Sequence, residues 1–313
     1  MSLDPVLKNF LAQLYAQPGP KMWEFTPAEA RQAFVLMMQF VAPKNVIVDK
    51  VENLRVPGPQ GEISLRSYTP AGAGAGTLPA LLFFHGGGFV IGNLDTHDGL
   101  CRVLANESAA RVVAVDYRLA PEYKFPAAVD DAWAALSWLA ANAERLGVDQ
   151  KRIAIGGDSA GAALATVSAH RAKEEGGPNL ALQLLMFPPT DLAAETPSRR
   201  KWTEGYFLDK LTIEWFFDNY LPRNADRRDP RLSPLRAGLR GIAPAYILTA
   251  QYDPLRDEAL EYAAKLRDSG VPVTVVDYPD LVHDFIYLDA VLPQAREALS
   301  AAARAVRDAL HSR

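Results

Sequence analysis

From about residue 63 onward, short runs of β-forming residues alternate with segments of helical periodicity. Several of these runs are nearly continuous in valine, isoleucine, leucine and phenylalanine, which is typical of strands buried on both faces of a sheet. Strands that alternate with helices predict βαβ units and a mostly parallel sheet, so the expected fold class is α/β. The predicted strands are Ile63–Tyr68, Leu78–His85, Arg111–Tyr117, Arg152–Ile155, Gln183–Phe187, Tyr246–Ala250 and Val271–Tyr278.

Apolar residues at helical spacing predict three helices between and after these strands. The first stripe includes Val129, Ala132 and Leu136, and Gly147 is expected to form the C-cap of this helix. The second helix is Leu255–Ser269, and the third has an apolar stripe that runs from Val291 to Val306.

Two regions break the alternation. Residues 1–45 are predicted to be helical, and residues 190–225 combine polar loops with an aromatic-rich helix. We therefore expect a helical cap over the sheet, made of an N-terminal part (1–45) and an insertion (190–225). The core is expected to consist of residues 46–189 and 226–313.

Composition excludes several classes of protein. The 313-residue chain has a single cysteine, Cys101, so it can form no internal disulfide and no cysteine-rich zinc site, and a reducing compartment is favoured. The formal net charge of −4 gives no support to a nucleic-acid partner or an anionic membrane surface. No signal-peptide pattern is visible, and the longest apolar stretches, such as Phe34–Met38, are far too short to span a membrane. We expect a cytoplasmic protein without stable membrane association.

The pentapeptide Gly157–Gly161, GDSAG, fits the pattern G-x-S-x-G. A predicted strand precedes it and an alanine-rich helical segment follows it, which is the context of the nucleophile elbow in α/β-hydrolases. On such a turn the hydroxyl of Ser159 is exposed at a helix N-terminus, where the helix dipole favours a developing negative charge. Ser159 is therefore the predicted nucleophile; the alternative is a serine that only caps a helix.

A serine nucleophile needs a base, and the chain has five histidines. His283 follows the last predicted strand and is the expected base. Asp253 follows the strand Tyr246–Ala250 and is the expected orienting acid, because Pro254 holds it out of helical geometry. Asp257, about one helical turn further on, is the alternative acid.

The tetrapeptide His85–Gly88, HGGG, comes directly after the predicted strand at Leu78. Three consecutive glycines cost conformational entropy and are useful where the backbone must approach a ligand closely. Peptide N–H groups of this loop, together with the N–H of Ala160, are expected to bind an oxyanion. His85 is expected to hold the loop through a backbone hydrogen bond.

Six motifs follow one another along the chain: HGGGF (His85–Phe89), DYRLAPE (Asp116–Glu122), FPAAVDD (Phe125–Asp131), GDSAG (Gly157–Gly161), DPLRDE (Asp253–Glu258) and HDF (His283–Phe285). In this order they resemble the bacterial hormone-sensitive-lipase-like carboxylesterases, in the branch that carries GDSAG. The resemblance implies an α/β-hydrolase fold with an eight-stranded sheet, one antiparallel strand and a helical cap. It also implies hydrolysis of short- to medium-chain acyl esters through an acyl-enzyme, without a metal or other cofactor. Homodimers are frequent in that family, so a second copy of the chain is an expected partner besides the ester substrate.

Carried over by motif, the resemblance assigns the nucleophile to Ser159, the acid to Asp253 and the base to His283. It assigns the oxyanion donors to the N–H groups of Gly87, Gly88 and Ala160.

The chain departs from that family pattern at Asp284, where glycine is usual after the histidine. Aspartate tolerates left-handed backbone, and its charge is expected to raise the pKa of His283; a side chain that points into solvent is the alternative. Within DYRLAPE, we expect Arg118, Glu122 and Asp116 to form one hydrogen-bonded network. Substrate contacts or, alternatively, cap packing are expected for Phe89, Tyr206, Phe207 and Leu208.

Other reactions remain open at this point. An amidase, a carbamate hydrolase or an acyltransferase would use the same serine. A ligand-binding relative would have lost the histidine, whereas this chain has Ser159, Asp253 and His283 together.

Overall fold

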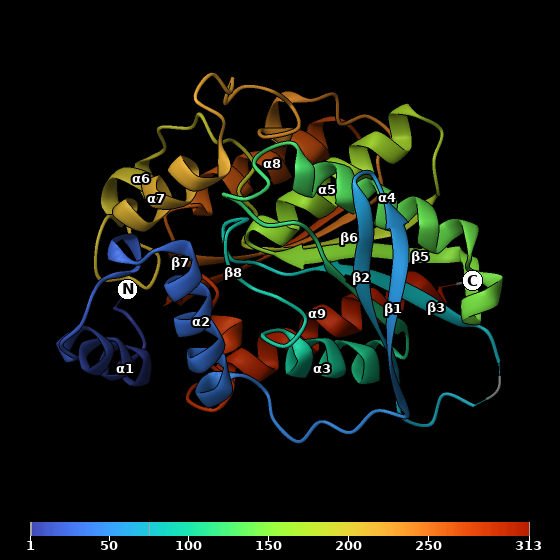
Figure 1. Cartoon of the computed structure of the whole chain (residues 1–313), viewed down its shortest axis with the longest axis horizontal. Helices are drawn as coiled ribbons and strands as arrows, with labels where there is room; N and C mark the ends of the chain where they lie inside the picture. The colour runs from blue at the N-terminus through green and yellow to red at the C-terminus, as the bar shows by residue number, and fades with distance from the viewer. Residues whose placement is uncertain (1, 75, 313) are drawn as a thin grey trace.

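In residues 2–74 and 76–312, which the computed structural model describes, eight strands form one sheet in the order β1-β2-β4-β3-β5-β6-β7-β8 (Figure 1). β2 pairs antiparallel with β1 and β4, and all other neighbouring strands pair parallel. This topology confirms the expected mostly parallel sheet with one antiparallel strand. The strands are β1 (Lys50–Gly58), β2 (Gly61–Thr69), β3 (Leu78–Phe84), β4 (Arg111–Asp116), β5 (Val148–Asp158), β6 (Leu180–Met186), β7 (Ala245–Tyr252) and β8 (Val273–Val282).

The two edge strands show where sequence patterns are weak. β1 was not predicted, because it pairs on one side only and Val56 is its one buried residue, so it carries no apolar run. β8, at the opposite edge, extends past the predicted end at Tyr278 to Val282. The extension brings residue 283 directly to the end of a strand.

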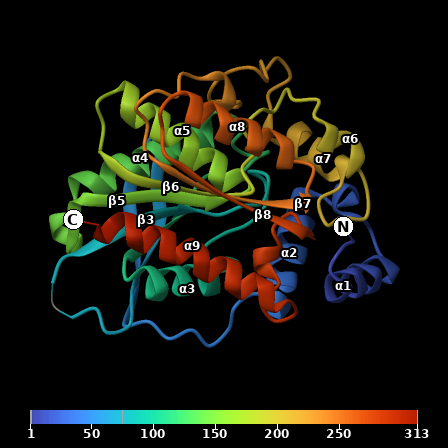
Figure 2. The same ribbon diagram turned by 180° about the vertical axis from the view of Figure 1, so that it is seen from behind.

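Helices cover both faces of the sheet. α3 (Asp98–Ser108) and α9 (Pro293–His311) lie on one face, and α4 (Ala127–Ala141), α5 (Ala160–Glu174) and α8 (Arg256–Asp268) lie on the other (Figures 1 and 2). The three helices predicted from apolar stripes correspond to α4, α8 and α9.

The predicted C-cap at Gly147 is wrong. α4 already ends at Ala141, and Gly147, with φ 62°, ends the one-turn 3-10 helix η2 (Glu144–Leu146) instead. Gly147 therefore has the left-handed conformation typical of a C-cap, but it caps the short helix that follows α4.

Two segments far apart in the sequence lie side by side near the ends of β7 and β8. They are the N-terminal helices α1 (Pro5–Ala16) and α2 (Pro27–Val41), and the inserted helices α6 (Pro197–Lys201) and α7 (Lys210–Tyr220) (Figures 1 and 2). The N–H of Phe207 donates a hydrogen bond to the hydroxyl of Tyr15, 3.0 Å away, and so links the two segments.

A capping box fixes the start of α2. The Glu29 carboxylate accepts from the N–H of Thr26 at 2.9 Å, and the Thr26 hydroxyl accepts from the N–H of Glu29 at 3.3 Å. The η1 turn (Met22–Glu24) lies just before this box. The N-terminal region is thus helical as predicted, in two α-helices joined by this turn.

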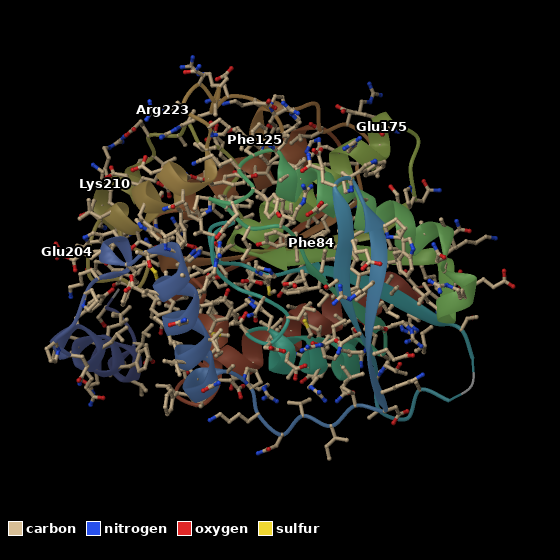
Figure 3. The ribbon with its side chains drawn as sticks, viewed as in Figure 1. Phe84, Phe125, Glu175, Glu204, Lys210 and Arg223 are labelled. Carbon is tan, nitrogen blue, oxygen red and sulfur yellow. The ribbon has the colours of Figure 1, made fainter. Side chains whose placement is uncertain are left out.

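The side chains in Figure 3 separate into a core and a charged periphery. Phe84, at the end of β3, is fully buried, whereas Glu204, Lys210 and Arg223 are exposed around the inserted helices. The buried β3 ends directly before His85, so the glycine loop begins inside the core.

Candidate active site

Ser159 occupies a strained turn between β5 and α5. β5 ends at Asp158, α5 begins at Ala160, and the serine between them has φ 47° and ψ −120°, which non-glycine residues rarely adopt. A Cβ on Gly161 would lie 2.0 Å from the carbonyl oxygen of Phe84, and one on Gly157 would lie 2.4 Å from the backbone of Gly161. The two glycines of the motif are thus needed for close packing of the turn.

Three residues that are distant in sequence meet at this turn. Nε2 of His283 lies 3.0 Å from the hydroxyl oxygen of Ser159, and Nδ1 lies 2.7 Å from Oδ2 of Asp253. The other oxygen of Asp253 accepts the N–H of Leu255 at 2.7 Å. All three of these side chains are buried, with no more than 8% of any of the residues exposed. The structure therefore brings together the serine, histidine and aspartate that the motifs indicated.

The alternative acid, Asp257, lies elsewhere. Its carboxylate accepts the N–H of Ser198 at 2.8 Å, at the start of α6. Other histidines also have separate environments: His170 faces the hydroxyl of Tyr262 at 3.2 Å, and Nδ1 of His85 lies 2.8 Å from the carbonyl oxygen of Gly86. The contact of His85 matches its expected role in holding the loop.

Asp284 adds a second carboxylate beside the imidazole. Its φ of 50° is left-handed, as the departure from glycine required, and its Oδ2 lies 3.2 Å from Nε2 of His283. Burial lowers the pKa of His283, but the charges of Asp253 and then Asp284 raise it more, to about 10. Burial raises the pKa of the Asp284 carboxyl. The side chain of Asp284 does not point into solvent. The geometry therefore favours the expected rise in the pKa of His283.

The loop after β3 leaves no space for side chains. A Cβ on Gly87 would lie 2.3 Å from the carbonyl oxygen of Ile91, and one on Gly88 would lie 2.2 Å from the ring of Phe216. Both glycines have positive φ, 108° and 58°. Within residues 2–74 and 76–312, the N–H groups of Gly87 and Gly88 donate to no other group. They are therefore free to bind an anion next to Ser159, in the cavity that both glycines line.

Sequence reasoning missed a buried network under this loop. The Asp158 carboxylate accepts the N–H of Gly86 at 3.0 Å and the hydroxyl of Tyr287, and it lies 3.3 Å from Nε2 of His97. Burial opposes ionisation of Asp158, but His97 and the hydroxyl of Tyr287 lower its pKa below the usual value. One carboxylate thus ties the elbow to the glycine loop and to the segment after His283. The only signal of this network in the sequence was Asp158, a charged residue among the small residues of GDSAG.

Within DYRLAPE, the expected single network is wrong. Arg118 pairs with Asp131 at 2.7 Å, and Glu122 pairs with Arg31 of α2 at 2.6 Å. The guanidinium of Arg31 also donates to the carbonyl oxygen of Val90 at 2.8 Å, so this pair ties α2 to the loop beside HGGG. The spacing of residues within DYRLAPE gives no indication of a contact with the N-terminal helix α2.

Two cavities open at Ser159. The larger, about 480 Å³, is lined by residues of the N-terminal segment and by His283, Asp284, Phe207 and Leu208. The smaller, about 40 Å³, is lined by Phe89 and Leu208, among others. Tyr206 is in neither lining; its ring packs against Tyr252 and Trp202, with centroids 5.3 and 4.8 Å apart. N-terminal residues that sequence reasoning did not select also line the larger cavity, among them Trp23, Phe25, Phe34 and Met37.

In the described ranges, no group of three or more His, Cys, Asp or Glu side chains is placed to hold a metal ion. Helices in the same ranges are all too short or too polar to cross a bilayer.

Comparison with known proteins places this site in a family. A family model described as the alpha/beta hydrolase fold matches residues 81–287, which include the elbow, the glycine loop and His283. The chain belongs to the α/β-hydrolase fold family. The resemblance predicted from the six motifs is thereby confirmed.

Relatives of this α/β-hydrolase carry esterase names. It is 46% identical over 296 residues to the carboxylic ester hydrolase LipN of Mycobacterium tuberculosis, covering 92% of this chain and 78% of LipN. It is 39% identical to the ethyl acetate hydrolase of Pseudomonas putida, covering 96% of each chain. Among solved structures, the ester-hydrolase EH1AB1 from the Lake Arreo metagenome has a TM-score of 0.95 and 42% identity, covering 99% of this chain and 100% of that one. An esterase of Pyrobaculum calidifontis has a TM-score of 0.93 and 40% identity, covering 98% and 99%.

Proposed function

We propose that this α/β-hydrolase is a serine carboxylesterase that hydrolyses short- to medium-chain acyl esters through an acyl-enzyme. The observation that carries the proposal is the contact series from Ser159 Oγ to His283 Nε2 at 3.0 Å and from His283 Nδ1 to Asp253 at 2.7 Å. The esterase names of relatives that align over most of this chain support it.

In the proposed mechanism, Ser159 is the nucleophile and His283 the base. Oγ bonds to the ester carbonyl carbon while its proton moves to Nε2, and the carbonyl oxygen becomes an oxyanion. Nε2 then gives this proton to the alcohol oxygen, the carbon–oxygen bond of the ester breaks, and the acyl group stays on Ser159. Water repeats the sequence with Nε2 as its base and releases the carboxylic acid.

Asp253 and the glycine loop support these steps in the proposed mechanism. The Asp253 carboxylate holds the Nδ1–H tautomer and stabilises the imidazolium. The N–H groups of Gly87, Gly88 and Ala160 bind the oxyanion; loss of one such donor lowers kcat by about 10²–10³-fold in comparable sites. The free N–H groups of Gly87 and Gly88 support this assignment.

Substrate contacts are proposed for Phe207 and Leu208 in the larger cavity and for Phe89 in the smaller one. Tyr206 would support this wall through its packing on Tyr252. The division into a cap (1–45 and 190–225) and a core (46–189 and 226–313) is part of the same proposal, since cap and core would contribute different walls of the site.

A cytoplasmic location and a homodimer are further parts of the proposal. Cys101 is a buried free thiol, as suits a reducing compartment. β8 is an edge strand, and pairing with the β8 of a second copy would extend the sheet. Cell fractionation tests the location, and light scattering on the purified chain tests the dimer; a monomer mass rejects the dimer.

The deciding experiment combines turnover with covalent labelling. The protein should hydrolyse p-nitrophenyl acetate faster than p-nitroacetanilide, and a serine-directed phosphonate should add once, on Ser159. Ser159→Ala should lose both turnover and labelling while circular dichroism shows a folded protein. Labelling at another residue, or retained turnover by the variant, rejects the mechanism; faster anilide cleavage identifies an amidase.

A further inference from the structure

The two cavities at Ser159 differ about twelvefold in size, 480 against 40 Å³. Both are lined by Ser159, Gly88, Leu208 and Phe216, so these residues form the boundary between them. Each substituent of an ester carbonyl carbon bound to Ser159 therefore has to enter one cavity or the other. Which substituent enters which cavity decides the class of ester that fits.

The position of the His283 imidazole determines which substituent of the ester enters which cavity. The alcohol oxygen must lie within hydrogen-bond reach of Nε2 to receive its proton. His283 lines the larger cavity and is absent from the lining of the smaller one. The proposed oxyanion donors lie on both sides: Gly87 lines only the larger cavity, Ala160 lines only the smaller one, and Gly88 lines both, so the oxyanion is expected at the boundary between them. With the oxyanion at this boundary, the alcohol substituent next to Nε2 faces the larger cavity, which leaves the smaller cavity for the acyl group.

We propose that this esterase selects esters of short acids with large apolar alcohols, the acyl group entering the cavity beside α7 and the alcohol entering the cavity under the N-terminal helices. The inference rests on the proposed function and names its substrate class. A cavity of about 40 Å³ has room for only a few groups of the size of a water molecule. An acetyl or propionyl group fits there with less displacement of the walls than a hexanoyl chain requires, so the shorter members of the proposed acyl range are favoured.

The walls of the smaller cavity are held firmly. The ring of Phe216 packs so closely on the glycine loop that a Cβ on Gly88 would lie 2.2 Å from it. Phe89 is stacked on the buried Tyr220, with centroids 4.0 Å apart. Neither ring can move aside for a longer acyl chain without losing this packing.

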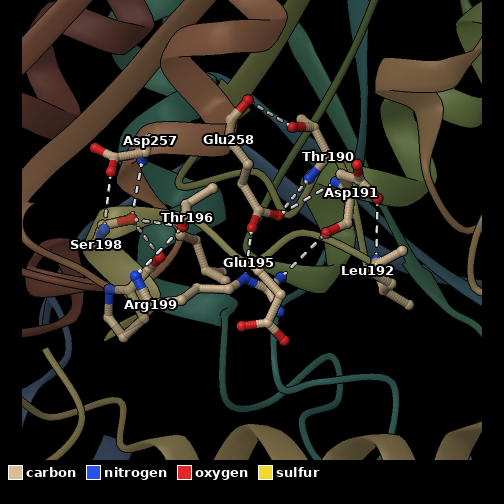
Figure 4. Close-up of polar contacts among 12 residues, drawn as sticks. Thr190, Asp191, Leu192, Glu195, Thr196, Ser198, Arg199, Asp257 and Glu258 are labelled. Atoms are coloured by element: carbon tan, nitrogen blue, oxygen red, sulfur yellow. Dashed lines mark hydrogen bonds and ion pairs between the residues drawn. The ribbon is translucent and has the colours of Figure 1, made fainter. Parts of the chain in front are cut away.

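The polar contacts drawn in Figure 4 hold Arg199, another lining residue of the smaller cavity. Arg199 lines the smaller cavity, and its Nε donates to the fully buried carboxylate of Glu258 at 2.7 Å. The same carboxylate accepts the N–H of Thr190 at 2.9 Å. The inserted segment is thereby anchored to α8 where it borders the acyl side.

The larger cavity suits a bulky apolar alcohol. Its lining is rich in aromatic and aliphatic side chains from the N-terminal segment, including Trp23, Phe25, Phe34 and Met37. Such a wall favours hydrocarbon over water. Asp284 lies on this side as well, next to the point where the alcohol leaves.

Isomeric esters test the proposal directly. Hexyl acetate and ethyl hexanoate have the same formula and similar leaving alcohols, and they differ in which side carries the long chain. We expect kcat/KM, divided by the rate constant of hydroxide hydrolysis for each ester, to be at least about tenfold higher for hexyl acetate. An equal or reversed ratio, or failure to turn over hexyl acetate, overturns the proposal. Loss of p-nitrophenyl acetate turnover as well would instead overturn the proposed function.

A substitution in α7 tests whether the wall of the smaller cavity limits the length of the acyl group. Ile213 lines only the smaller cavity, so Ile213→Ala should widen it and lower the ratio at least about fivefold. Leu211→Ala is the matched control, because Leu211 is exposed on the same helix and lines neither cavity. An unchanged ratio in Ile213→Ala, or an equal change in Leu211→Ala, overturns the assignment. Should Ile213→Ala fail to fold, the ratio measured on the unmodified protein still decides.

Discussion

The carboxylate of Asp284 lies 3.2 Å from Nε2 of His283, the same nitrogen that faces Ser159 Oγ at 3.0 Å. Oδ1 of Asp284 has no hydrogen-bond partner in the described part of the chain. On the other side of the imidazole, Asp253 contacts Nδ1 of His283. The charge of Asp158 raises the pKa of the Asp284 carboxyl further. A proton on Nε2 is thus stabilised by a carboxylate on each side of the ring.

Removal of the Asp284 charge should shift the pH profile. The base must be neutral to accept the Ser159 proton, and the raised pKa of His283 keeps it protonated to higher pH. Asp284→Asn tolerates the left-handed backbone but lacks the charge, so the acidic limb of kcat/KM should move to lower pH, by about one unit or more. Asp284→Gly, which also removes the charge, should move the limb in the same direction. A limb that stays in place in both variants means that the charge is not felt at Nε2.

The tether from Asp158 to the glycine loop should affect turnover more than binding. Asp158→Asn weakens the contact with the Gly86 N–H and leaves His97 without its ionised partner. We expect kcat to fall by about 10–100-fold, because the oxyanion donors lose their fixed position, with KM changed much less. Tyr287→Phe removes only the hydroxyl that donates to Asp158 and should have a smaller effect. A rise in KM with unchanged kcat would contradict this role.

Gly88→Ala should abolish most activity through a clash. Its Cβ would meet the Phe216 ring at 2.2 Å, whereas Gly176 has a similar φ, 66°, with no atom within 4 Å. Gly176→Ala therefore measures the backbone cost alone, about 1 kcal/mol in the free energy of unfolding. Gly88→Ala should in addition lower kcat/KM by about 10² or more. Equal activity in the two variants would show that space at residue 88 is not required.

The Arg199–Glu258 pair should contribute strongly to the stability of the inserted segment. Arg199→Met leaves a buried carboxylate without its cation, at a cost of about 3 kcal/mol in the free energy of unfolding. The double variant Arg199→Met, Glu258→Gln removes the charge as well and should recover part of that loss. Urea unfolding of the two variants checks this, and a double variant less stable than the single one would refute it.

Local patterns in the sequence predicted what depends on local spacing. GDSAG between a buried strand and a helix placed Ser159 correctly, because both glycines and the flanking elements are neighbours in the chain. Asp253 and His283 were selected because each follows a predicted strand within a few residues, and the carboxyl ends of parallel strands meet at one edge.

Contacts between distant segments were not predictable in this way. The pairing of Arg31 with Glu122, and of His97 with Asp158, joins residues that share no periodicity. His97 directly precedes α3, but its side chain forms no cap and is fully buried. Edge strand β1 was not predicted because nearly all of its residues are exposed or half-buried, so its sequence has no apolar pattern.

The reacting side chains and the cavity walls come from different parts of the chain. Ser159, Asp253 and His283 lie on connections at the ends of β5, β7 and β8, whereas the N-terminal segment (residues 14–37) and α7 supply much of the wall around them. Exchange of residues in these two parts of the chain can therefore alter which molecules are admitted while the bond-breaking atoms keep their places. Selection on the N-terminal segment and on α7 can therefore refit the molecule to a new ester.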